Sequence, residues 1–269
     1  MNGSSSNQKA IICVIQLSHA TPRGILCARR RSKETLADDG MKALHKVIIT
    51  GTGRSGTTFL VRLLTELGFD TGYDAGNLGG FVDERSHGGL ERDLPRPQEF
   101  RDLRHVWRQP KHVIRDVLLG PRPTPYILKN PAFCDTLGPI LAEGSLMVDH
   151  AYVPVRALDA AAMSRARIGG TNGALSGGLW KTDDPNNQKA VLAEMFCNLV
   201  HTLVVHEIPH TFLLFPRLVE DWKYTHRKLE FLAGDIAPSA FREVFERVAD
   251  PSLVHQFAPH APKPGLCKI

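Results

Sequence analysis

The sequence predicts an α/β fold in three layers, with a central parallel β-sheet flanked by helices. Two observations lead to this fold class. The β-branched run at 46–50, KVIIT, has the composition of a strand buried on both faces. A glycine-rich turn follows it, and residues 57–67 then carry leucines at helical spacing before Gly68. Because such strand and helix patterns alternate along the chain, we expect a parallel sheet covered on both faces.

The remaining elements continue this alternation. Asp184 and Pro185 are residue types preferred at a helix N-cap and first turn. We therefore expect a long helix that starts there and reaches about residue 205. Glycine-rich stretches predict long loops at 73–100, where short helical pieces or a lid are expected, and at 168–182. The predicted strands are 46–50, 126–129, 146–155 and 211–215. The predicted helices are 57–67, 101–119, 158–166, 184–205, 222–233 and 238–248.

Residues 1–40 differ in composition from the rest of the chain. They begin with the polar stretch MNGSSSNQ and end with the charged stretch ARRRSKETLADDG, whereas Met41 opens the segment MKALHKVIITGTG. We expect 1–40 to be a flexible, disordered extension, or upstream codons read from an early start. Residues 41–269 are predicted to form a single domain, in keeping with about 100–200 residues per domain.

The composition, 42% hydrophobic and 23% charged, is that of a soluble globular protein. Residues 1–40 hold six basic and three acidic side chains, so the net charge of +5 leaves only +2 for the rest. A nearly balanced folded part does not predict a nucleic-acid partner. No apolar run approaches the roughly 18 residues of a membrane span. The five cysteines contain no CxxC pair and indicate reduced thiols in a cytoplasmic protein.

The segment 51–58, GTGRSGTT, follows the first strand and opens the first helix. Glycines there let the backbone curl so that several N–H groups converge on one anion, and the helix N-terminus adds partial positive charge. The spacing fits a P-loop nucleotide-binding fold, but Thr57 stands where a Walker lysine would be. Arg54 can supply the missing positive charge. The predicted phosphate-binding residues are Gly51, Thr52, Gly53, Arg54, Ser55, Gly56, Thr57 and Thr58.

The run from Arg54 to Thr58, RSGTT, resembles the 5′-phosphosulfate loop of sulfotransferases, a family that lacks the Walker lysine. A second motif agrees with it. The segment YVPVR ends the strand 146–155 at Arg156, and Ser164 follows eight residues later, similar to the family's 3′-phosphate segment. The late segment 215–221 also resembles the family's strand–helix junction. The resemblance spans roughly residues 46–235 and implies 3′-phosphoadenosine 5′-phosphosulfate as co-substrate, with Arg156 and Ser164 holding its 3′-phosphate.

The resemblance implies transfer of a sulfuryl group to a hydroxyl or amine of a small-molecule or carbohydrate acceptor. Negative charge grows on the leaving phosphate oxygen, so donors aimed at that oxygen should contribute most. Arg54 is one such donor. Lys129, in the segment YILKNP, resembles the family's strand-end lysine and is the candidate that stabilises the moving sulfuryl group or the leaving oxygen.

The general base does not carry over from the family. Cytosolic sulfotransferases place a histidine two residues after the strand lysine, and that position is Pro131 here. Glu91, after the pair of glycines in the 73–100 loop, is our first candidate. His87 is the second, because its pKa suits base catalysis near neutral pH. The loops 73–100 and 168–182 are expected to line the acceptor site.

Histidine pairs elsewhere do not predict a metal site. The segment 206–210, HEIPH, lacks the HExxH arrangement, and its proline would end a helix. Asp149 and His150 are adjacent in a strand and should face opposite sides, so we expect a histidine satisfied within the fold. Two alternatives to the sulfotransferase remain open, a P-loop kinase of a small metabolite and a non-catalytic nucleotide-binding protein. The sequence does not indicate an oligomeric state.

Overall fold

A computed structural model describes residues 34–36, 42–73, 125–131, 133–142, 144, 146–169, 178–251 and 254. Within these ranges five strands form one sheet, with β2 at its centre. One edge of β2 pairs in parallel with β4, which pairs in parallel with β5. Its other edge pairs in parallel with β3 and, nearer the start of β2, antiparallel with β1. The strands are β1 (Glu34–Leu36), β2 (Lys42–Ile49), β3 (Ile127–Lys129), β4 (Leu146–Val155) and β5 (His210–Leu214).

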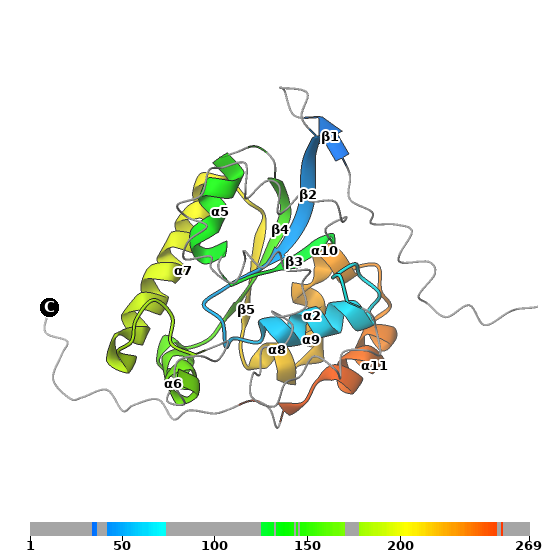
Figure 1. The fold of residues 1–269 in the computed structure, drawn as a ribbon. Coiled ribbons are helices and arrows are strands. Elements are labelled where there is room, and N and C mark those ends of the chain that lie inside the picture. The colour runs from blue at the N-terminus through cyan, green and yellow to red at the C-terminus, as the bar shows by residue number, and fades with distance from the viewer. Residues whose placement is uncertain are drawn as a thin grey trace, which may run out of the picture.

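Two hydrophobic clusters lie on opposite faces of this sheet, because neighbouring strand residues point to opposite sides. Val47 and Ile49 of β2 belong to one cluster, whereas Ile48 between them belongs to the other. Helices α2 and α8–α11 cover the Val47 face, and α5–α7 cover the Ile48 face (Figure 1). The α/β fold class with a parallel sheet between two helical layers is therefore confirmed.

The helices agree with most of the predicted ones. The α-helices are α2 (Thr57–Glu66), α5 (Phe133–Ala142), α6 (Leu158–Gly169), α7 (Gln188–Val205), α8 (Arg217–Glu220), α9 (Trp222–Lys228), α10 (Glu230–Ala233) and α11 (Pro238–Val248). Asp184 does cap a helical turn, accepting a bond from the N–H of Asn186. That turn is the 3₁₀ helix η4 (Pro185–Asn187), which leads directly into α7.

Three elements differ from the predicted ones. The helix α5 was not predicted, and it contains Gly138 and Pro139, which sequence patterns treat as breaks. The predicted helix 222–233 is interrupted at Leu229, which ends α9 and precedes α10. The short helix α8 follows a cis peptide bond between Phe215 and Pro216 and was expected only as a junction.

Several predictions lie on residues outside the described ranges. The strand β1 falls within 1–40, where we expected a flexible extension, and most of that segment is not described. The predicted helix 101–119 and nearly all of the loop 73–100 also lie outside the described residues. No helix in the described ranges is long and apolar enough to cross a membrane.

The connections from the central strand β2 diverge to its two sides at the carboxyl end of the sheet. The chain leaves β2 through α2 toward β3 on one side, and β4 then pairs with the opposite side of β2. The helix after β2 and the helix after β4 cover different faces. Ligands of open α/β sheets bind where connections diverge in this way, at the carboxyl ends of the strands. The loop after β2 and Arg156 after β4 both lie at this position.

Candidate phosphate-binding site

Residues 51–56, which we call the phosphate loop, connect β2 to α2 through a tightly curled backbone. Gly51, Gly53 and Gly56 have φ angles of 145°, 71° and 91°, and Arg54 has a φ of 57°. These values lie in the left-handed region, which glycine adopts at little cost. Successive turns of this kind make a concave row of N–H groups that suits an anion. The glycines thus occupy positions where the backbone has a left-handed conformation.

Close packing requires two of these glycines for a second reason. A Cβ atom on Gly53 would collide with a guanidinium nitrogen of Arg165. A Cβ atom on Gly56 would lie 2.9 Å from the ring of Phe215 and 3.1 Å from a methyl group of Leu218. The phosphate loop is therefore held between α6 on one side and the end of β5 on the other.

Arg156 and Ser164, from the second predicted motif, both contact the phosphate loop. Arg156 follows β4 directly, and its Nη1 donates to the carbonyl oxygen of Arg54 at 3.0 Å. Arg54 Nε donates in turn to Ser164 Oγ, on α6, at 3.1 Å. Burial and the like charge of Arg54 both lower the pKa of Arg156. The two positive charges thus lie close enough to repel each other, an arrangement that a bound dianion would stabilise.

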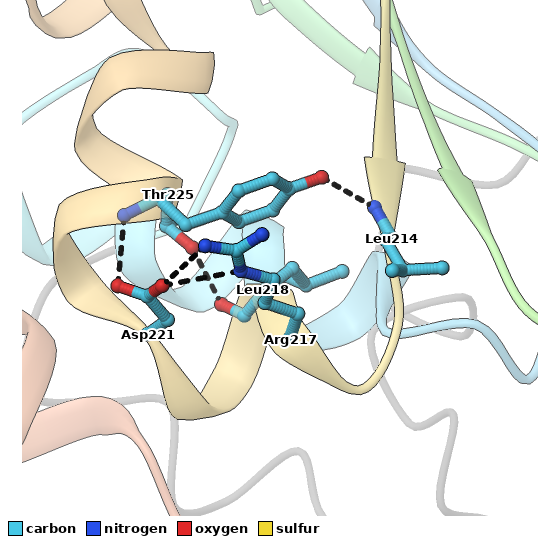
Figure 2. A network of polar contacts seen from close by, with 6 residues as sticks. Leu214, Arg217, Leu218, Asp221 and Thr225 are labelled. Carbon is cyan, nitrogen blue, oxygen red and sulfur yellow. Dashed lines mark hydrogen bonds and ion pairs between the residues drawn. The ribbon is translucent and has the colours of Figure 1, made fainter.

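Phe215 packs beside Arg156. The Arg156 guanidinium carbon lies 4.9 Å from the centroid of the Phe215 ring, a cation–π geometry. A polar network holds the turn that carries Phe215 (Figure 2). In it, Asp221 accepts bonds from the Arg217 guanidinium and from the N–H of Tyr224, whose hydroxyl accepts a bond from the N–H of Leu214.

The phosphate loop also presents polar groups for which the described residues offer no hydrogen-bond partner. Ser55 is fully buried, and its Oγ has no hydrogen-bond partner among the described residues. Within the same ranges, the N–H groups of Gly53, Ser55 and Gly56 donate no backbone hydrogen bond. Buried polar atoms rarely stay unpaired, so these donors fit a phosphate or sulfate oxygen.

Lys129 ends β3 beside the phosphate loop. It pairs in register with Ile49, the last residue of β2, and only 4% of it is exposed. Ile127 belongs to the cluster on the α2 face, and alternation places the Lys129 side chain on that face as well. Lys129 is therefore buried at the carboxyl end of the sheet, the same end from which the phosphate loop extends.

The structure thus brings together most of the predicted site residues, although their roles in binding and catalysis stay predictions. Gly51 to Thr58, Lys129, Arg156 and Ser164 gather at the carboxyl edge of β2, β3 and β4. The two base candidates, Glu91 and His87, lie outside the described residues.

Three residues near the phosphate loop were not predicted to belong to the site. Arg165 and Phe215 contact the loop from distant parts of the chain, so no local pattern marks them. Cys134, on α5, lies 3.8 Å from the Thr50 hydroxyl, and burial raises the pKa of its thiol to about 11. A thiol with that pKa stays protonated near neutral pH and is a poor nucleophile.

Asp149 and His150 have different partners, but a register shift between β2 and β4 at this point interrupts the alternation from which their opposite orientation was predicted. Asp149 contacts His45 at 2.6 Å and accepts a bond from the Tyr126 hydroxyl at 2.8 Å, whereas His150 contacts the Thr211 hydroxyl at 2.9 Å. The ring of His150 is thus satisfied within the fold, as expected. Within the described ranges, no three histidine, cysteine or acidic side chains are grouped to hold a metal ion.

No protein-family model and no curated protein matches the chain. Among solved structures, the chain is similar to the sulfotransferase domain from the Synechococcus PCC 7002 olefin synthase. The sequence identity is 16%, over 82% of this chain and 85% of that chain, with a TM-score of 0.42. It is also similar to the sulfotransferase domain from the curacin biosynthetic pathway, at 14% identity over 71% and 72% of the two chains, with a TM-score of 0.37. Similarities at this level establish neither a family nor an activity.

Proposed function

We propose that this protein is a sulfotransferase-like enzyme that uses 3′-phosphoadenosine 5′-phosphosulfate as sulfuryl donor. One observation carries the proposal: Arg54, Arg156 and Ser164 come from three elements and meet at a glycine loop that has no Walker lysine. A kinase or ATPase would be expected to bridge the β- and γ-phosphates with that lysine. Two arginines and a serine at one end of the loop instead suit a nucleotide with a second, separate phosphate.

The residues of the site divide between the two anionic ends of this donor. In the proposal, the N–H groups of the phosphate loop and the Ser55 hydroxyl hold the 5′-phosphosulfate, together with Thr57 and Thr58 at the start of α2. Arg156 and Ser164 hold the 3′-phosphate, with Arg54 between the two ends. The Ser55 hydroxyl, which lacks a partner among the described residues, and the glycine curl support this division, because both suit an anion at that place.

The proposed reaction breaks the bond between sulfur and the bridging oxygen and forms a bond from sulfur to an acceptor oxygen or nitrogen. Negative charge then develops on the leaving phosphate, where Arg54 and the helix N-terminus would stabilise it. Lys129 is proposed to hold the moving sulfuryl group. The acceptor, a small-molecule or carbohydrate hydroxyl or amine, loses a proton to a base, for which Glu91 and then His87 are our candidates.

Calorimetric titration with adenosine 3′,5′-bisphosphate tests the proposal. The variant Arg156→Ala should weaken binding about 10- to 150-fold, because charge-assisted hydrogen bonds contribute about 1.5–3 kcal/mol. Arg242→Ala, which removes an exposed arginine paired with Glu246 on α11, should leave the affinity unchanged. Ser55→Ala is a second test, since it removes a hydroxyl that has no partner among the described residues.

Parallel titrations separate the alternatives. A preference for ATP with magnesium over the bisphosphate would favour a small-metabolite kinase and would contradict the proposal. Tight binding of the bisphosphate without any sulfated product, when the donor is supplied with a cell extract, would favour a non-catalytic nucleotide-binding protein. An unchanged affinity in both Arg156→Ala and Ser55→Ala would remove the proposed site itself.

A further inference from the structure

Arg165, next to Ser164 on α6, contacts the phosphate loop and a second segment at the same time. Its Nη2 donates to the carbonyl oxygen of Thr52 at 2.9 Å, and its Nη1 donates to the carbonyl oxygen of Gly178 at 2.9 Å. Its guanidinium carbon lies 4.7 Å from the centroid of the Trp180 ring. Only 5% of the residue is exposed, so the planar guanidinium joins two backbone segments inside the fold.

The segment 178–180 is itself anchored to the helical layer. The N–H of Trp180 donates to Gln188 Oε1 at 2.6 Å, and Gln188 Nε2 donates back to the Trp180 carbonyl oxygen at 3.4 Å. Gln188 is fully buried at the start of α7. Next to this segment, Lys181 forms an ion pair with Asp135 of α5 at 2.6 Å. Arg165 therefore connects the phosphate loop to a segment that hydrogen bonds attach to α7.

The geometry of the peptide bond gives this contact a consequence for anion binding. In a trans peptide the carbonyl oxygen and the next N–H point in opposite directions. Because the Thr52 carbonyl points to Arg165, the N–H of Gly53 points away from that guanidinium. The Arg54 carbonyl is held by Arg156 in the same way, which orients the N–H of Ser55. Two arginines thus each fix one peptide plane of the phosphate loop.

We propose that Arg165 is a positioning residue that aims the N–H of Gly53 at the bound anion and links the phosphate loop to the segment 178–180. The inference rests on the proposed function in one respect, since it takes the anion to be the phosphosulfate end of the donor nucleotide. Arg156 acts in parallel on the N–H of Ser55. Removing either arginine releases a different amide of the same loop.

Amide resonances in the ¹H–¹⁵N spectrum distinguish the two peptide planes. Inorganic phosphate and adenosine 3′,5′-bisphosphate should each shift the Gly53 and Ser55 amide protons of the wild type. In Arg165→Met the Gly53 response should be lost and the Ser55 response kept, and the bisphosphate should bind about tenfold or more weakly. Leu203→Ala, a buried change at the far end of α7, controls for loss of stability and should keep both responses.

Further variants keep the test open if Arg165→Met does not fold. Arg165→Lys retains the charge but not the planar fork that reaches both carbonyls, so the Gly53 response should still be lost. Gly53→Ala places a Cβ against the Arg165 guanidinium, whereas Gly144→Ala imposes nearly the same φ, 72°, in open space. Only Gly53→Ala should weaken bisphosphate binding.

The outcomes separate this inference from the proposed function. If phosphate shifts the Gly53 amide but the bisphosphate binds no more tightly than phosphate, the proposed function fails and the role of Arg165 stands. If neither ligand shifts the Gly53 amide resonance of the wild type, the inference is overturned. An Arg165→Met or Arg165→Lys variant with a wild-type Gly53 response, or an affinity within about twofold of the wild type, also overturns it.

Discussion

At Gly56 the backbone turns from the phosphate loop into α2 with a φ of 91°, and the ring of Phe215 lies 2.9 Å from the position that a Cβ would take. Conformation and packing both demand glycine there. Gly68, just beyond the end of α2, has nearly the same φ, 87°, but no atom lies within 4 Å of the position of a Cβ. An alanine at either position would suffer the same backbone strain, but only at Gly56 would its methyl group meet a neighbour.

We expect Gly68→Ala to lower the free energy of unfolding by about 1–2 kcal/mol, the cost of a left-handed non-glycine residue. Gly56→Ala should lose about 1–3 kcal/mol more, because the new methyl group overpacks against Phe215 and Leu218. Urea denaturation measures both values. Equal losses in the two variants would show that the Phe215 ring moves aside and does not restrain the loop.

At the residue scale, the sequence predicts those site residues that lie close together along the chain. The glycines and Arg54 occupy one short stretch, and its residue types specify both the curl and the charge. Arg156 and Ser164 were predicted through the resemblance of a second stretch to the 3′-phosphate segment of sulfotransferases. Arg165 and Phe215 were missed because their contacts with the loop join residues more than 100 positions apart. Only the packing of α6 and β5 against the sheet brings them there.

Among the elements, the helix α9 depends on a cap that also organises the end of β5. Asp221 accepts the N–H of Tyr224 at the helix N-terminus and two bonds from the Arg217 guanidinium, and the Tyr224 hydroxyl accepts the N–H of Leu214 (Figure 2). The bond from the Tyr224 N–H and then the bond from Arg217 lower the pKa of Asp221 below 3.8. The cap therefore acts through the ionised carboxylate.

A carboxylate with a lowered folded-state pKa stabilises the fold fully above its unfolded-state pKa, and this contribution is lost as the pH falls through the folded value. Asp221→Asn should therefore be less stable than the wild type at about pH 6, and the difference should shrink below about pH 3.5. Thermal unfolding at both pH values measures the effect. Asp184→Asn, at the cap of η4, is the matched control for the substitution of a capping carboxylate. A constant deficit at all pH values would contradict the charged cap.

The elements that the sequence predicted well are those with an uninterrupted pattern. The strand 146–155 and the helix 238–248 have the predicted bounds, because an apolar run and an amphipathic repeat each persist to their ends. The helix α5 was hidden by Gly138 and Pro139. Its buried side, with Phe133 and Leu137, packs on β4 and α7, so tertiary burial outweighs the local penalty of the proline.

For the molecule as a whole, β4 links the two helical layers through alternating side chains. Tyr152 contributes to the cluster beneath α2 and α8–α11, whereas Ala151 and Val153 contribute to the one beneath α5–α7. His150, earlier on the same strand, contacts Thr211 of β5 and stacks on Phe231 of α10, with ring centroids 4.8 Å apart. Its ring therefore joins three elements, and its protonation state bears on the stability of the entire domain.

Burial, and to a smaller extent the nearby His210, lower the pKa of His150 from 6.5 to about 4. Between these two values the unfolded chain binds a proton that the folded protein excludes, so the free energy of unfolding should fall as the pH falls. His150→Gln removes this linkage, so its stability should change less between about pH 7 and pH 4.5 than that of the wild type. His201→Gln, at an exposed position on α7, is the matched control for the substitution itself. Denaturant titrations at several pH values give the slopes, and parallel slopes for the wild type and His150→Gln would mean that His150 takes up its proton equally well in the folded domain.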